Sequence, residues 1–135
     1  MRAVQRKGAD MIRILLAEDD QVMREYLARA LERSGYRVTS VDRGTAAMPL
    51  LQTETFDLLL TDIVMPEMDG IELAQRASEI APTMRVMFIT GFAAVTLKAG
   101  QAMPNARILS KPFHLRELVM EVDRLFEQDS ANGIN

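Results

Sequence analysis

Apolar and polar positions divide the chain into short apolar segments that alternate with longer segments of helical periodicity. Two of the short segments, 58–60 and 87–89, are apolar at every position, as expected for parallel strands that are covered on both faces. This alternation predicts an α/β fold in which helices cover both faces of a parallel sheet. The expected strands are 12–17, 37–41, 56–61, 85–90 and 106–110.

The segments between the expected strands differ in how clearly they predict helices. The second helix would contain Pro49, so we expect it either to begin late or to kink at Met48. The fourth, 93–102, is rich in alanine and carries Gly100, and we expect local softness there. The other three helices have apolar residues at regular helical spacing. They are expected at 21–34, 70–80 and 115–126.

The composition is that of one compact domain. The chain has 135 residues, of which 48% are hydrophobic and 26% are charged, enough to bury a sizeable core. We expect this domain to span 11–127, between a flexible N-terminal extension, 1–10, and a flexible C-terminal tail, 128–135. No linker to an output domain is evident, so we expect a single-domain protein.

Charge and residue usage exclude several classes of function. A net charge of -3 without a basic cluster argues against binding of nucleic acid. The chain has no cysteine, which removes disulfides and thiolate metal sites. No segment approaches the roughly 20 apolar residues of a membrane helix, and the N-terminus lacks the apolar core of a signal peptide. We therefore expect a cytoplasmic protein that does not insert into a membrane.

Polar side chains follow four of the expected strands at the point where each strand ends. Glu18 and Asp19 follow the first strand, Asp62 the third, Thr90 ends the fourth, and Lys111 follows the fifth. Because parallel strands end at the same edge of a sheet, we expect these side chains to converge. Acids, a hydroxyl and an ammonium would then face one another.

This set of side chains is suited to phosphoryl chemistry. A carboxylate such as Asp62 can attack phosphorus and form an acyl phosphate if a cation neutralises the phosphoryl oxygens. Mg²⁺ prefers oxygen ligands, which Glu18, Asp19 and Asp62 offer, and like charges about 4 Å apart repel by about 4 kcal/mol without it. We interpret Asp20 differently, as the residue that caps the first helix.

At this point the motifs resemble those of a known family, the receiver domains of two-component response regulators, over about 11–126. The resemblance implies a flavodoxin-like, CheY-like fold with five parallel strands in the order 2-1-3-4-5 and five helices. It implies Asp62 as phosphoacceptor and Mg²⁺ held by Glu18, Asp19, Asp62 and the backbone carbonyl of Val64. The motifs that carry it are 14–20, 60–70, 89–91 and 110–113.

The resemblance also assigns supporting roles. Thr90 and Lys111 would bind the phosphoryl group and switch with it, and the Lys111–Pro112 bond would be cis, as is common in the family. Ile108 stands where many receivers have an aromatic switch residue, so we expect coupling to run instead from Thr90 through the fourth helix. The residues expected to shape and orient the loops are Pro66, Gly70, Gly91 and Pro112.

The family implies partners as well as chemistry. A histidine kinase or histidine phosphotransferase would supply the phosphoryl group. A closer likeness, to alphaproteobacterial single-domain regulators, implies that the unphosphorylated form controls substrate delivery to the ClpX/ClpXP protease. In receivers, the positions two residues after the phosphoacceptor and two residues after the switch hydroxyl often tune dephosphorylation. Here they hold Val64 and Phe92, which are apolar and cannot orient an attacking water. We therefore expect a long-lived acyl phosphate and no turnover enzyme.

Two other functions stay open at this stage. One is a Mg²⁺-dependent phosphohydrolase with Asp62 as nucleophile, although Val64 stands where haloacid-dehalogenase-like enzymes have an acid–base carboxylate. The other is a phosphate-insensitive interaction module. Met65, Met68 and Phe92 would suit either a partner surface or loop packing, and the single histidine, His114, has the position of a helix cap.

Overall fold

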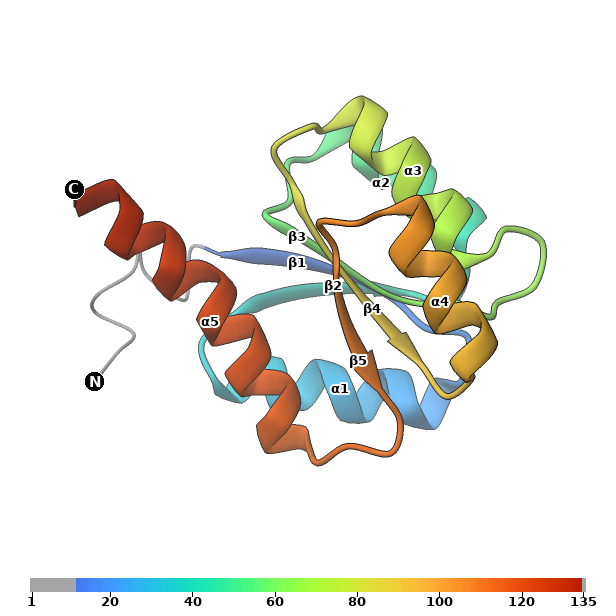
Figure 1. The fold of residues 1–135 in the computed structure, drawn as a ribbon, viewed down its shortest axis with the longest axis horizontal. Coiled ribbons are helices and arrows are strands. Elements are labelled where there is room, and N and C mark those ends of the chain that lie inside the picture. The colour runs from blue at the N-terminus through green and yellow to red at the C-terminus, as the bar shows by residue number, and fades with distance from the viewer. Residues whose placement is uncertain (1–11, 135) are drawn as a thin grey trace.

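A computed structural model describes residues 12–134. Five parallel strands form one sheet in the order β2-β1-β3-β4-β5, with helices on both faces (Figure 1), which confirms the expected fold. The elements are β1 (Arg13–Ala17), α1 (Gln21–Arg33), β2 (Arg37–Val41), α2 (Gly44–Thr53), β3 (Leu58–Asp62), α3 (Gly70–Ile80), β4 (Arg85–Thr90), α4 (Ala93–Ala102), β5 (Arg107–Ser110) and α5 (Leu115–Ile134).

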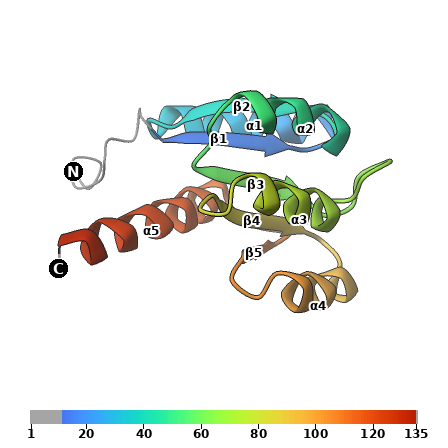
Figure 2. The ribbon, with the colours of Figure 1, turned by 90° about the horizontal axis from the view of Figure 1, so that it is seen from above.

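Two apolar cores lie on opposite faces of the sheet. Because side chains alternate along a strand, Leu16 and Leu60 face α1 and α5, whereas Leu15 and Leu59 face α2, α3 and α4. Figure 1 shows the sheet between these two sets of helices, and Figure 2 looks onto the sheet from above, with the strands side by side in the order β2-β1-β3-β4-β5. All of these leucines are fully buried, so β1 and β3 form the centre of the molecule and fix the position of the residues at their ends.

Helix α2 differs from the sequence-based expectation. It begins at Gly44, five residues before Pro49, so the expected late start is wrong. Pro49 removes one amide donor, which leaves the carbonyl of Thr45 without its usual helical partner. Both residues are exposed, and solvent can hydrate that carbonyl. An exposed face therefore tolerates a proline that a buried face would not.

Helix α5 is longer than expected. It continues to Ile134, so residues 128–134 are helical where we expected a tail. This stretch has no proline that would end the helix. The expected extension at 1–10 lies outside the described residues, and the limits of the domain stay a prediction. None of the described helices is both long enough and apolar enough to cross a bilayer.

Candidate functional site

Carboxylates from two neighbouring strands meet at the carboxyl edge of the sheet. β1 pairs with β3, and Ala17 lies opposite Thr61, so Glu18 and Asp19 follow one strand where Asp62 ends the other. One oxygen from each of these three acids lies within 4.8 Å of the others. This spacing would allow the three acids to share one cation.

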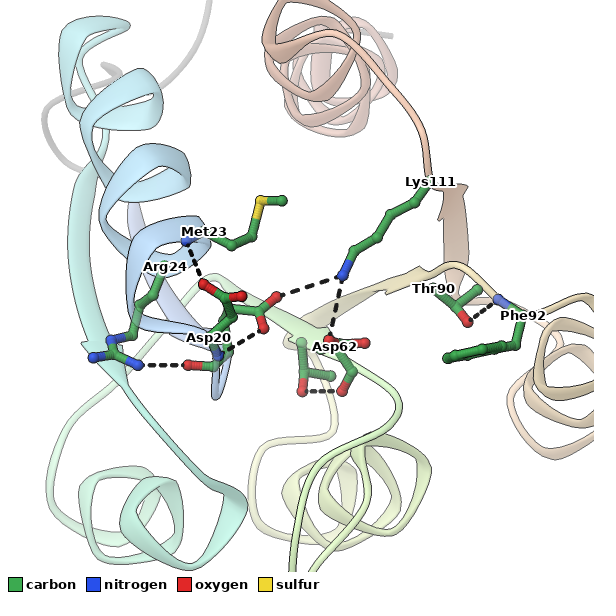
Figure 3. A network of polar contacts seen from close by, with 9 residues as sticks. Asp20, Met23, Arg24, Asp62, Thr90, Phe92 and Lys111 are labelled. Atoms are coloured by element: carbon green, nitrogen blue, oxygen red, sulfur yellow. Dashed lines mark hydrogen bonds and ion pairs between the residues drawn. The ribbon is translucent and has the colours of Figure 1, made fainter.

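A lysine approaches the same acids from the other side (Figure 3). The Nζ atom of Lys111 lies 3.5 Å from Oδ2 of Asp62 and 4.0 Å from Oε1 of Glu18. Lys111 directly follows β5, and the Lys111–Pro112 bond is cis, as the resemblance implied. The ammonium group of Lys111 therefore lies beside the proposed phosphoacceptor, and the three acids remain close to one another.

Glu18 carries the most perturbed carboxylate of the site. Its side chain is almost fully buried, and burial raises its pKa to about 7, helped by the nearby negative charge of Asp62. The backbone N–H of Asp20 donates to Oε2 over 3.1 Å and, like Lys111, opposes this shift. Oε1 has no hydrogen-bond partner among the described residues. A buried carboxylate oxygen that accepts no hydrogen bond and lies beside two further acids fits a hard divalent cation such as Mg²⁺.

Two aspartates start the helices that border this edge. Asp20 accepts a hydrogen bond from the N–H of Met23 over 2.9 Å and caps α1, which confirms our interpretation of this residue. Asp69 caps α3 in the same way through the N–H of Glu72. Each cap fixes the loop that precedes its helix.

The loop after β3 is packed closely against the end of that strand. Gly70 donates from its N–H to the carbonyl of Ile63 over 2.7 Å, and a Cβ at Gly70 would lie 2.1 Å from the carbonyl oxygen of Asp62. Met65 and Met68 are buried in the core under α2 and α3, so they pack the loop and do not form an exposed surface. Pro66 accepts from the N–H of Met68 over 2.8 Å, whereas Val64 is about half exposed.

The end of β4 forms the opposite wall. Thr90 is buried, its hydroxyl accepts from the N–H of Phe92 over 3.1 Å, and its carbonyl accepts from the N–H of Lys111 over 2.7 Å. A cavity of about 190 Å³ adjoins Thr90. A Cβ at Gly91 would lie 3.8 Å from Cβ of Lys111, an ordinary contact. The cavity is lined by Thr90, Gly91, Phe92, Ala93, Thr96, Ser110 and Lys111.

The remaining sequence candidates lie away from the acids or play structural parts. Ile108 is half-buried and packs against the core under α4. The N–H of His114 donates to Oε1 of Glu117 over 2.9 Å, so His114 lies at the cap of α5, as its position predicted. Sequence reasoning missed Arg24, whose guanidinium donates to the carbonyl of Glu18 over 2.8 Å. The sequence feature that could have identified Arg24 is a basic residue one turn into the helix that follows the acidic run.

Comparison with known proteins identifies the family. The family model described as the response regulator receiver domain matches residues 14–123 of the chain. The chain belongs to this family. It is 61% identical, over 116 residues, to the response regulator receiver protein CpdR of Brucella abortus (strain 2308), and the match covers 85% of this chain and 97% of that protein.

Solved structures agree with this membership. The fold is similar to a CheY-like receiver domain protein from Methanospirillum hungatei JF-1, with a TM-score of 0.81, 26% identity, and coverage of 90% of this chain and 98% of the other. It is also similar to the response regulator TrrA of Thermotoga maritima in complex with Mg(2+)-BeF. There the TM-score is 0.77 at 26% identity, over 85% of this chain and 99% of that one.

Proposed function

We propose that the protein is a phosphorylation-operated switch of a two-component phosphorelay, with Asp62 as its phosphoacceptor. The observation that carries the proposal is Oε1 of buried Glu18, which accepts no hydrogen bond from the described residues, lies within reach of Asp62 and meets only the distant ammonium of Lys111 at 4.0 Å. A structural acid would have a partner for that oxygen, because a buried carboxylate without one is costly. A bound cation would remove this cost.

Mg²⁺ would be held by Glu18, Asp19, Asp62 and the backbone carbonyl of Val64, with phosphoryl oxygens and water as its other ligands. When bound, it supplies positive charge against the phosphoryl oxygens. The similarity to TrrA, whose solved complex contains Mg(2+)-BeF, supports this assignment. So does the oxygen-only donor set.

The other steps of phosphoryl transfer are assigned to Asp62, Lys111 and Thr90. A carboxylate oxygen of Asp62 forms the new bond to phosphorus while the bond from phosphorus to the donor breaks. Lys111, 3.5 Å from Asp62, then pairs with the added phosphoryl oxygens, and the hydroxyl of Thr90 turns its proton toward them. In the present structure this hydroxyl accepts from Phe92, so its own proton stays available to donate.

Phosphorylation would add negative charge at the site, and this charge would drive the change in protein contacts. By analogy with other phosphorylated residues, phosphorylated Asp62 carries about -1.5 to -2 at neutral pH, and rearrangement of Thr90 and Lys111 then alters protein contacts. Val64, half exposed beside the acids, and Phe92, 61% exposed, offer no group that would orient an attacking water. A long-lived acyl phosphate follows, and turnover as a phosphohydrolase is disfavoured.

The proposed partners follow from the family and from CpdR. A histidine kinase or histidine phosphotransferase would phosphorylate Asp62, in the cytoplasm. Because the chain is 61% identical to CpdR, we further propose that its unphosphorylated form controls delivery of substrates to ClpXP. A pulldown of ClpX with wild type and with Asp62→Ala, each with and without acetyl phosphate, tests this step. Release of ClpX from wild type alone upon phosphorylation is expected.

Incubation with acetyl phosphate and Mg²⁺, followed by intact-mass measurement, tests the central proposal. We expect one phosphoryl adduct per chain, which disappears in Asp62→Asn and when EDTA replaces Mg²⁺. Asp20→Asn is the matched control, because asparagine also caps a helix, and it should keep the adduct. Continuous phosphate release would instead favour the phosphohydrolase, and absence of any adduct would favour the phosphate-insensitive interaction module.

A further inference from the structure

Three hydrogen bonds hold Glu18 in place, two through its backbone and one through its side chain. Its N–H donates to the carbonyl of Val41 over 3.1 Å, which ties the end of β1 to β2. Its Oε2 accepts from the N–H of Asp20 over 3.1 Å. Its carbonyl accepts from the guanidinium of Arg24 over 2.8 Å. These three contacts leave Oε1 as the oxygen of this residue that lies near the other acids and accepts no hydrogen bond from the described residues.

The contact from Arg24 has a consequence that the other two lack. The carbonyl of Glu18 belongs to the peptide group that joins Glu18 to Asp19, so its direction sets how both side chains leave the backbone. In Figure 3, Arg24 and Lys111 lie on opposite sides of Asp20. Its own N–H donates to the carbonyl of Asp20 over 2.8 Å, which places Arg24 in the first turn of the capped helix. The start of α1 and the two acids thus form one hydrogen-bonded unit.

We propose that Arg24 is a positioning residue that orients Glu18 and Asp19 for Mg²⁺. The inference rests on the proposed function, because it presupposes that these acids bind the ion. Arg24 touches neither Asp62 nor the side-chain oxygens of Glu18 in the described contacts, so it acts through the peptide group that it holds. Partners that orient metal ligands in this way commonly change metal affinity about 10-fold to 100-fold when they are removed.

The direction in which the Mg²⁺ affinity changes when Arg24 is removed distinguishes a positioning role from a purely electrostatic one. Arg24 is a cation close to an acidic site, so removal of its charge alone would strengthen Mg²⁺ binding. Removal of its hydrogen bond to Glu18 frees the peptide group and weakens binding. The two explanations therefore predict opposite changes in the dissociation constant of Mg²⁺ for Arg24→Ala.

The test is a calorimetric Mg²⁺ titration of the wild-type protein, Arg24→Ala, Arg24→Lys and the matched control Arg29→Ala. Arg29 is an exposed arginine on the same helix, so its removal takes the same charge from α1 without the contact to Glu18. We expect the dissociation constant to rise about tenfold in Arg24→Ala, to be partly restored in Arg24→Lys, and to stay unchanged in Arg29→Ala. Thermal denaturation without metal checks that every variant is folded.

A second readout separates positioning from damage to the fold. With acetyl phosphate, Arg24→Ala should need more Mg²⁺ for half-maximal adduct formation but reach the wild-type rate at saturating Mg²⁺. An unchanged or lower dissociation constant in Arg24→Ala, beside wild type that binds Mg²⁺, would overturn this inference alone. Wild type that binds no Mg²⁺ would overturn the proposed function, and this inference with it.

Discussion

The two sides of the site differ in how deeply they are buried and in how their helices are capped. The acid half, residues 17–21 and 62–70, joins the buried ends of β1 and β3 to helices whose N-cap residues are aspartates. The response half, residues 90–111, joins β4 to α4, whose N-cap residue, Phe92, makes no capping hydrogen bond with its side chain and whose one buried residue is Ala99. β5 that follows is half-exposed along its length. The fold thus fixes the proposed cation ligands and leaves the segment around Thr90, the proposed switch hydroxyl, loosely packed.

This difference suits the two tasks of the proposed switch. Ligands for a cation must be fixed before it arrives, because ordering them during binding costs affinity. A segment that reports phosphorylation must instead have a second arrangement within a few kcal/mol. Leu97 and Phe92, more than half exposed, contribute little burial that would oppose such a change. The predictions below test whether the two halves differ in this way.

The largest expected effect is that of a single methyl group in the acid half. Gly70→Ala would place a Cβ 2.1 Å from the carbonyl oxygen of Asp62, which is backbone and cannot move aside cheaply. We expect a loss of about 3 kcal/mol in the free energy of unfolding. The matched change in the response half, Gly91→Ala, meets Lys111 at an ordinary 3.8 Å and should cost less than about 1 kcal/mol. Urea denaturation of both variants measures the difference, and equal losses would contradict it.

The next effect concerns the pH dependence of the acid half without metal. Burial raises the pKa of Glu18 from 4.5 to about 7 in the folded protein, so the folded state holds this proton more tightly than the unfolded chain. The resulting stabilisation is complete below about pH 4.5 and is lost as the pH rises toward 7, a decrease of about 2 kcal/mol between pH 5 and pH 7. Mg²⁺ should restore stability above pH 7, because it favours the ionised carboxylate.

Variants isolate this contribution from other titrating groups. Glu18→Gln cannot ionise, so its free energy of unfolding should change less between pH 5 and pH 7 than that of wild type, and Mg²⁺ should stabilise it less. Glu79→Gln removes an exposed acid from α3 and should behave like wild type. Guanidinium denaturation at the two pH values measures the change. Parallel pH profiles for wild type and Glu18→Gln would show that Glu18 is not the group responsible.

Much of the fold and site could be predicted because local rules determine them. The apolar runs gave the strands, and their parallel order brought Glu18, Asp19 and Asp62 to one edge. Tertiary context decided what the sequence left open. Pro49 is tolerated in α2 because it lies on an exposed face, which no pattern in the sequence states.

Contacts between side chain and backbone were the other part that the sequence could not supply. The bond from Arg24 to the carbonyl of Glu18 depends on the path of the loop between them, and arginines at this spacing commonly point into solvent. The burial of Met65 and Met68 likewise follows from how the loop folds back toward α2. Patterns predict which elements form, whereas loop geometry determines which partners their polar and flexible side chains find.

The smallest expected effect compares the starts of α1 and α4. Asp20→Ala removes the cap of α1 and should cost about 1 kcal/mol, whereas Phe92→Asn would add a cap to α4 and should gain about 0.5 kcal/mol. Phe92 has φ -120° and ψ 119°, an extended conformation that suits a capping residue, and its exposed ring contributes little burial. Urea denaturation and amide exchange in the first turn of α4 measure the gain. A loss above about 1 kcal/mol in Phe92→Asn would mean that the ring of Phe92 anchors α4. The response half would then be fixed before phosphorylation, and Phe92 would have to move for Thr90 to reach the phosphoryl group.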